Sequence, residues 1–484
     1  MNRSIRAVAI FSFILVMALI ANLTYIQAFQ QKSLAHNPLN SRQFLEAKSQ
    51  ERGRITAGGQ VLAQSVKDSE DFYDREYPYM SAKYGSVIGY LSDQYGASGI
   101  ESSQNSILTG EDDSLFATRT WDMLTGKEVG GANVELTLNP KVQEVAYDQL
   151  ANKGYSGSVV ALRPSTGEVL AMASTPSADP GRIVGPPAEE AKANFDNYAK
   201  DESSPLLNRS TQQIQPPGST FKVITTAAAL KDGDNPNTSV TAASQITLPG
   251  TNTTLENYGG AACGGGGTTT LREAFKRSCN TAFVEMANRH GTDKFKDVAR
   301  AFGVGEKDDY LGLPVEPSRL GDIPDDAALG QSSIGQRDVA LTPLQNAVIA
   351  ATVANGGVRM KPYLVSKITG RDLSTLRTTK PQKAGRAIPE KTADTLKELM
   401  VDAEKWAGGD ASIASKTGTA EHGEDSRNSK PHSWYIAFST SADVAVAVLV
   451  ENGGDRGQAA TGGSVAGPIG RAVIHAAEKE QQEP

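Results

Sequence analysis

The chain has 484 residues, a formal net charge of −7, a charged fraction of 21% and a hydrophobic fraction of 39%. These fractions are those of a folded protein, and the length suggests two or three domains. The net negative charge carries no basic signature, so nucleic acid is excluded as an expected partner. Two cysteines exclude a disulfide-dense scaffold and a four-cysteine metal site.

The N-terminus predicts a membrane anchor. An apolar run begins at Ala7 and continues to Phe29, which is long enough to cross a bilayer as a helix of roughly 20 residues. Two arginines and no acidic residue precede it, which favours a cytoplasmic tail of residues 1–6 and an extracellular position for the rest. Because a small-x-small cleavage site is missing around Tyr25, an uncleaved single-pass anchor is favoured over a cleaved signal peptide.

Residues 30–150 are expected to form an elongated mixed domain without a catalytic constellation. Within them the segment RITAGGQVLA predicts a short strand, a turn at Gly58-Gly59 and a second strand. Polar residues dominate its beginning, and glycines and tyrosines its middle. This composition indicates a spacer or docking surface.

A cleaner pattern begins at residue 140 with a helix, followed by a hairpin over residues 157–174 that turns at Pro164–Gly167. Residues 205–400 read mostly as helices. Three consecutive strands and a final helix, Val465–Lys479, then close the chain. The pattern predicts an α+β fold. Its five-stranded antiparallel sheet has the terminal helices on one face and the helical insertion on the other.

Three short motifs carry the candidate chemistry. In PPGSTFK, Ser219 and Lys222 lie three residues apart at the start of a predicted helix, so their side chains share one face. A lysine whose pKa is lowered by burial or by a neighbouring cation can take the proton of a serine nucleophile. Alone, this spacing is weak, because a serine and a lysine at i,i+3 are also common on surface helices.

The other two motifs supply groups that could hold a substrate. KRSCNTAF offers the hydroxyl of Ser278 and the amide of Asn280, although S-x-N also reads as a turn followed by a helix cap. SKTGTAE places Lys416, Thr417, Gly418 and Thr419 on a predicted strand, where the cation and hydroxyls can bind a carboxylate and the glycine admits a substrate backbone. An ordinary edge strand is the alternative.

In this order, S-x-x-K, S-x-N and K-T-G resemble the signature of the penicillin-binding protein and serine β-lactamase superfamily. The segments GSVVALRPSTGEVLAMASTP and SSIGQRDVALTPLQNAVIAATVANGGVRMKP look like parts of transpeptidase domains. RGRITAGGQVLAQS resembles the opening of the non-catalytic domain of class B enzymes, above all the short class B proteins of actinobacteria. The resemblance implies a non-catalytic, pedestal- or dimerisation-like domain over residues 30–150 and a transpeptidase domain with an all-helical subdomain over 151–484.

By that resemblance, Ser219 is the nucleophile, Lys222 its base, Ser278 the group that passes the proton to the leaving amine, and Asn280 a substrate-orienting residue. The side chains that would hold the terminal carboxylate are Lys416, Thr417 and Thr419, with Gly418 beside the bound substrate. The backbone N–H groups of Ser219 and Thr419 would form the oxyanion hole. The implied reaction is D,D-transpeptidation of stem peptides ending in D-Ala-D-Ala, with β-lactams as mimics. No metal or organic cofactor is implied.

The resemblance also gives meaning to Cys263 and Cys279. In an oxidising compartment a disulfide between them would tether the glycine-rich loop AACGGGGTTT to the middle of the second motif. Two free thiols, with Cys279 buried behind the site, are the alternative. The polar loop HGEDSRNSKPH after the third motif would either line the rim of the cleft or form a solvated hairpin loop.

Rival functions share this machinery in part. A class A β-lactamase would carry E-x-x-L-N after the second motif, and the stretch EKDDYLGLPVEPSR does not match it. A D,D-carboxypeptidase differs only in using water instead of an amine, and a catalytically silent β-lactam-binding scaffold would keep the fold without turnover. The family suggests a polytopic membrane glycosyltransferase and proteins of the division or elongation machinery as partners.

Overall fold

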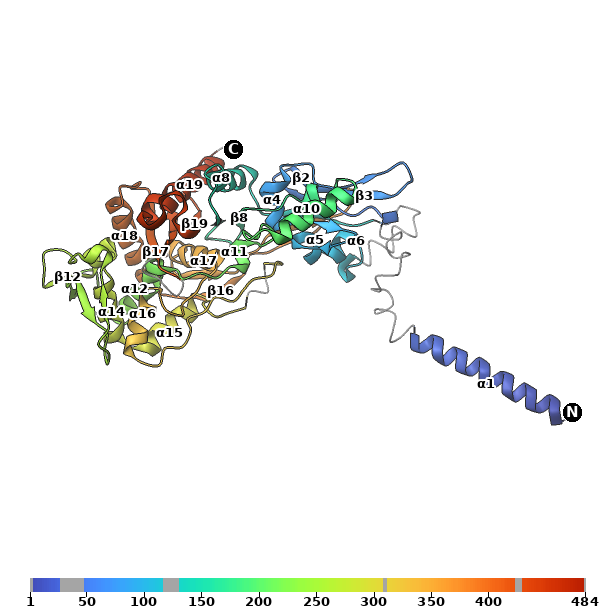
Figure 1. Cartoon of the computed structure of the whole chain (residues 1–484), viewed down its shortest axis with the longest axis horizontal. Helices are drawn as coiled ribbons and strands as arrows, with labels where there is room; N and C mark the ends of the chain where they lie inside the picture. Colours follow the sequence, from blue (N-terminus) through green and yellow to red (C-terminus); the bar gives the residue numbers. More distant parts are fainter. Residues whose placement is uncertain (1–2, 27–47, 116–129, 308–310, 423–428, 483–484) are drawn as a thin grey trace.

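The computed structural model describes residues 3–26, 48–115, 130–307, 311–422 and 429–482 (Figure 1). It begins with helix α1, Arg3–Tyr25. Of this helix, Ile5–Tyr25 is long and apolar enough to cross a membrane, with a mean hydropathy of 2.4, and none of it is buried. This agrees with the predicted anchor over residues 7–29, the end of which lies outside the described residues. The orientation across the membrane stays a prediction.

The predicted five-stranded antiparallel sheet is confirmed. Its order is β17-β18-β19-β7-β8, and every neighbouring pair is antiparallel. Four of the strands are buried along their whole length, because helices cover both faces and leave no solvated side to alternate with. The strands are β7 (Gly157–Leu162), β8 (Val169–Thr175), β17 (Ile413–Ala420), β18 (His432–Ser439) and β19 (Ala445–Val450).

Helices from the two ends of this domain pack side by side on one face of the sheet (Figure 1). They are α8, Pro140–Ala151, which the Asn139 side chain caps, and α19, Gly467–Gln482. Helix α17, Pro343–Ala354, lies on the opposite face against β7, β18 and β19. The predicted placement of the helices on the two faces is therefore confirmed.

The helical insertion supplies the other wall of the catalytic region. Helix α12 lies at its centre and packs against α14, α15 and α18. The interval 205–400 also holds short two-stranded ribbons, which the periodicity did not predict. They pair β9 (Ser239–Thr241) with β12 (Thr268–Thr270) and β10 (Gln245–Thr247) with β11 (Thr254–Glu256). The helices are α12 (Lys222–Lys231), α13 (Leu271–Arg277), α14 (Asn280–His290), α15 (Thr292–Ala301), α16 (Asp326–Ser333) and α18 (Glu390–Trp406).

A second sheet, of order β15-β14-β6-β1-β2-β3, forms the non-catalytic region. Gly58 and Gly59, both at positive φ, make the predicted turn between its first two strands. Two of its strands come from residues 365–378, far along the chain. The strands are β1 (Ile55–Ala57), β2 (Gln60–Lys67), β3 (Tyr73–Glu76), β6 (Asn133–Leu136), β14 (Val365–Thr369) and β15 (Thr375–Thr378).

A buried carboxylate fastens this region together. Glu101, on helix α5 (Gly99–Ser103), has no exposed surface. It pairs with Arg52 at 2.9 Å and with Arg75 at 2.6 Å, and both arginines are buried as well. The domain division at residue 150 stays a prediction. The packing of α8 on the catalytic sheet favours a division before Pro140.

Candidate active site

Ser219 lies where the sequence predicts it, at the entry to a helix. Residues Gly218–Phe221 form a 3-10 turn that runs directly into α12, which begins at Lys222. Gly218 has a positive φ of 53°, and a Cβ there would lie 2.8 Å from the carbonyl oxygen of Thr419. A glycine is therefore required for Ser219 to approach strand β17 this closely.

The two motif lysines meet at the second motif. Lys222 Nζ donates to the carbonyl oxygen of Ser278 and to Asn280 Oδ1, both at 2.7 Å, and lies 3.3 Å from Ser278 Oγ. Lys416 Nζ donates to Ser278 Oγ at 2.8 Å and to the Thr417 carbonyl at 3.0 Å. The Ser278 hydroxyl thus lies between two amines, which is the arrangement a proton-passing group needs.

Ser278 and Asn280 are held rigidly between two helices. Ser278 ends α13 in the left-handed region at φ 61°, and Asn280 is the first residue of α14. Asn280 Nδ2 donates to the carbonyl oxygen of Glu256 at 2.9 Å. Its amide therefore joins Lys222 to the end of strand β11, which precedes the glycine-rich segment.

Strand β17 is an edge strand, paired on one side with β18. Gly418 faces the nucleophile turn, and a Cβ there would lie 2.8 Å from the carbonyl oxygen of Pro217 and 2.9 Å from Thr220 Cγ2. A side chain at this position would push the strand away from Ser219. The third motif is thus on the predicted strand, with its glycine at a close approach.

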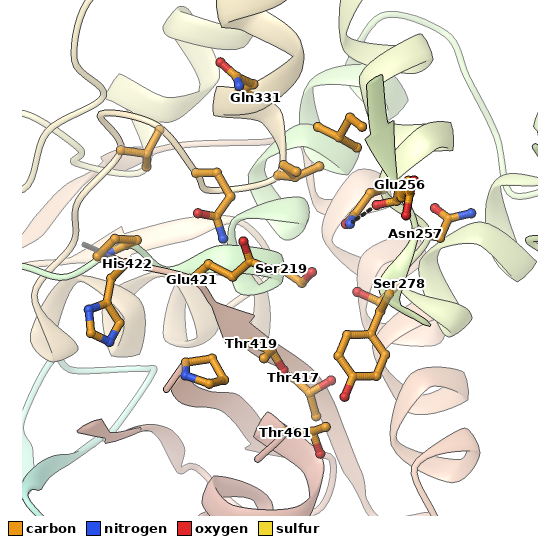
Figure 2. A pocket seen from close by; sticks show the side chains of 18 of the residues that line it. Ser219, Glu256, Asn257, Ser278, Gln331, Thr417, Thr419, Glu421, His422 and Thr461 are labelled. Carbon is orange, nitrogen blue, oxygen red and sulfur yellow. Dashed lines mark hydrogen bonds between the residues drawn. The ribbon is translucent and has the colours of Figure 1, made fainter. Parts of the chain in front are cut away.

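These motifs line one cleft of about 1640 Å³. Figure 2 shows Ser219 between Glu421 and Ser278, with Thr417 and Thr419 on the strand beside it. The motif residues on its wall are Ser219, Ser278, Asn280, Thr417 and Thr419. Both ends of the polar loop after β17 reach the cleft rim through His422 and Ser429. The middle of that loop, residues 423–428, lies outside the described residues.

Burial changes the chemistry of both lysines. Lys222 is 0% and Lys416 2% exposed. Burial, with the nearby charge of Lys416 as a second cause, holds the pKa of Lys222 well below its ordinary value. Burial also lowers the pKa of Lys416 to about 7. A neutral Lys222 has two N–H groups, which its two short hydrogen bonds use, and keeps one lone pair to accept a proton.

We expect acylation by benzylpenicillin to slow as the pH falls through the lowered pKa of Lys222, because protonation removes that lone pair. In Lys416→Met the like charge is gone, so the pKa of Lys222 rises and the acid limb moves to higher pH. Stopped-flow acylation rates between about pH 5 and pH 9, each normalised to its plateau, check this. An acid limb in the same place in both proteins would contradict the coupling of the two lysines.

Cys263 and Cys279 form a disulfide with a Cα–Cα separation of 6.0 Å across 16 residues of sequence. Both half-cystines are buried. Because Cys279 lies between Ser278 and Asn280, the bond ties the glycine-rich loop directly to the second motif.

Replacing both cysteines by serine is expected to lower the free energy of unfolding by about 2–4 kcal/mol, since the unfolded chain loses a constraint. Acylation should slow at the same time, because Asn280, which accepts a hydrogen bond from Lys222, follows Cys279 directly. Thermal melting and penicillin acylation with and without a phosphine reductant provide the measurements. The reductant should lower the melting temperature and the acylation rate of the wild type and leave those of the double variant unchanged. A wild type whose melting temperature and acylation rate do not change with the reductant would contradict this prediction.

Three groups that fasten the site were missed by the sequence analysis. Buried Glu404, on α18, accepts hydrogen bonds from Tyr435 at 2.9 Å and from Ser415, the residue before Lys416. Trp434 Nε1 donates to the carbonyl oxygen of Pro216 at 2.8 Å. A Cβ on Gly462 would lie 2.2 Å from the Trp434 carbonyl. Among these, only the paired glycines of TGGSVAG could have given a sequence signal, because one glutamate in a charged helix or one tryptophan in a strand gives none.

The geometry is that of a serine acyl-transferase, and comparison with known proteins identifies its class. The family model for the penicillin binding protein transpeptidase domain matches residues 157–475. The model for the penicillin binding protein A dimerisation domain matches residues 52–134. The chain therefore belongs to the penicillin-binding protein family, as a class B member.

Individual relatives match along almost the whole chain. Peptidoglycan D,D-transpeptidase PbpA of Mycolicibacterium smegmatis is 50% identical over 99% of this chain and 100% of the relative. PbpA of Mycobacterium tuberculosis is 48% identical over 99% of both chains. A solved ceftriaxone acyl-enzyme complex of penicillin-binding protein A from M. tuberculosis superposes with a TM-score of 0.86, covering 90% of this chain and 99% of that one at 48% identity.

Proposed function

We propose that the protein is a peptidoglycan D,D-transpeptidase that cross-links stem peptides through an acyl-enzyme on Ser219. The observation that carries the proposal is the meeting of two buried lysines of lowered pKa at Ser278 Oγ, in the cleft that Ser219 lines. Relatives named as D,D-transpeptidases at 48–50% identity support the same activity.

In the first step, Lys222 takes the hydroxyl proton of Ser219, whose Oγ attacks the carbonyl of the penultimate D-alanine. The backbone N–H groups of Ser219 and Thr419 would stabilise the oxyanion. Ser278 then passes a proton to the nitrogen of the last D-alanine, which leaves. Asn280 orients the peptide, and the carboxylate of the leaving residue is held by Lys416, Thr417 and Thr419.

In the second step, an amine of a neighbouring stem peptide attacks the acyl carbon. A β-lactam follows only the first step, because its ring-opened product keeps its leaving nitrogen attached.

We place the catalytic domain outside the membrane with residues 1–6 in the cytoplasm, which the charge pattern around α1 supports. We also propose a polytopic glycosyltransferase and division or elongation proteins as partners, which the family favours.

The full-length chain in detergent, given a D-Ala-D-Ala stem peptide and an amine acceptor, tests this function. We expect release of D-alanine together with an amide-linked product. Release of D-alanine with only the hydrolysed peptide would assign a D,D-carboxypeptidase instead. Neither product, with penicillin still bound, would assign a silent scaffold, and rapid loss of penicillin without an adduct would assign a β-lactamase.

A further inference from the structure

The cleft extends to both sides of Ser219, and the reaction assigns each side a different occupant. Figure 2 shows Glu421 and His422 on one side of Ser219 and Ser278 on the other. In the proposed function Ser278 donates a proton to the leaving amine. The leaving residue therefore lies on the Ser278 side of the cleft. Attack by the acceptor amine is the reverse of that departure and follows the same path. The acceptor stem therefore enters from the Ser278 side.

Two strongly exposed aromatic side chains stand on that side of the cleft. Trp406, the last residue of α18, is 55% exposed, and Tyr258 is 69% exposed. Both line the cleft. The Tyr258 loop is joined to the second motif, because Thr281 N donates to Asn257 Oδ1 at 3.1 Å. Exposed aromatic surface inside a cleft is typical of a binding site, since a rigid ring gives contact area at little entropic loss.

Cations surround the tryptophan ring. Arg277 Cζ lies 4.5 Å and Lys276 Nζ 5.4 Å from the ring centroid of Trp406. Both cations line the cleft, and Arg277 immediately precedes Ser278. Lys276 and Arg277 both form ion pairs with Glu273, and Arg277 Nε lies 3.1 Å from Glu273 Oε2. The two cations thus share the carboxylate of Glu273, and Glu256 is a further carboxylate on the same side of the cleft.

We propose that Tyr258, Lys276, Arg277 and Trp406, hereafter the acceptor platform, bind the acceptor stem peptide. The rings lie against its backbone and the cations attract its terminal carboxylate. This inference rests on the proposed transpeptidase function and adds where the acceptor binds and which of its groups is recognised. In the step it serves, the acceptor nitrogen bonds to the acyl carbon, the bond from that carbon to Ser219 Oγ breaks, and the amine proton returns to Oγ.

The partition of the acyl-enzyme between amine and water tests the platform. The probes are an N-acyl-D-alanyl thioester as donor and a stem peptide with a side-chain amine as acceptor, with the full-length chain in detergent. We expect Trp406→Ala to lower the ratio of amide to hydrolysed product about fivefold to tenfold. Trp406→Phe should keep most of the wild-type ratio of amide to hydrolysed product. Leu373→Ala, at an exposed apolar residue that does not line the cleft, serves as the control.

A second pair of variants tests the charge. The wild type should prefer an acceptor with a free terminal carboxylate over the same peptide with a terminal amide by about threefold, the size expected of a partly exposed ion pair. Arg277→Gln should abolish this preference and Arg277→Lys should keep it. Such a change of preference would not follow from a merely structural role.

The outcomes separate the two proposals. A wild type that forms no amide product would refute the transpeptidase function itself. A wild type that forms it, with the same partition ratio in Trp406→Ala and the same carboxylate preference in Arg277→Gln, would overturn the platform alone. A parallel fall in penicillin acylation and partition in Trp406→Ala would also overturn it, because the tryptophan would then serve the step that both reactions share.

Discussion

Ser219→Ala is expected to abolish the covalent adduct with benzylpenicillin and to reduce D-alanine release by at least about 10⁴-fold. The substitution removes the only atom to which the acyl group is attached in the proposed mechanism. The rest of the cleft should persist, because the hydrogen bonds of Lys222 and Lys416 run to Ser278, Asn280 and Thr417. Intact mass spectrometry of the full-length protein after incubation with penicillin measures the adduct directly.

The matched control is Ser374→Ala, which changes an exposed serine at the β14–β15 hairpin. It should bind one penicillin per chain, as the wild type does. An adduct of unchanged amount on Ser219→Ala would move the nucleophile to another residue. Reversible binding of penicillin to Ser219→Ala would be compatible, since the carboxylate-binding residues of β17 remain.

Glu101→Ala is expected to give the largest loss of stability, about 3–5 kcal/mol. The substitution removes a carboxylate with no exposed surface and leaves the guanidinium groups of Arg52 and Arg75 buried without their anion. Breaking a buried pair in this way is far more destabilising than losing a surface ion pair. Thermal unfolding followed by calorimetry should show the loss in the transition of the non-catalytic region.

Glu70→Ala, at an exposed glutamate after β2, provides the control and should shift the melting temperature little. Penicillin acylation by Glu101→Ala at low temperature should stay close to that of the wild type, because Glu101 lies in the region of the second sheet and not on the cleft wall. A melting profile unchanged in Glu101→Ala would show that the two arginines find other partners and would contradict the prediction.

Most of the sheet and the position of the nucleophile could be predicted because their signals are local. The alternation of apolar runs with turns at Pro164–Gly167 marked the hairpin, and the break at Pro217-Gly218 marked the entry to α12. Strands β14 and β15 could not be predicted as part of the non-catalytic sheet. Strand β14 pairs with β6 and β15 pairs with β14, and no pattern within residues 365–378 specifies a partner as distant as β6.

The amino-acid sequence by itself determined the chemistry that is available: a serine and a lysine one helical turn apart, an S-x-N and a K-T-G on a strand, and an apolar N-terminal helix. Only the tertiary structure decided how these groups act. It joined Lys222 to Ser278 across 56 residues and Lys416 to Ser278 across 138 residues, and it buried both amines. Desolvation is what lowers the pKa of a lysine, and it depends on the whole fold. Motif spacing alone therefore could not decide whether Lys222 is neutral.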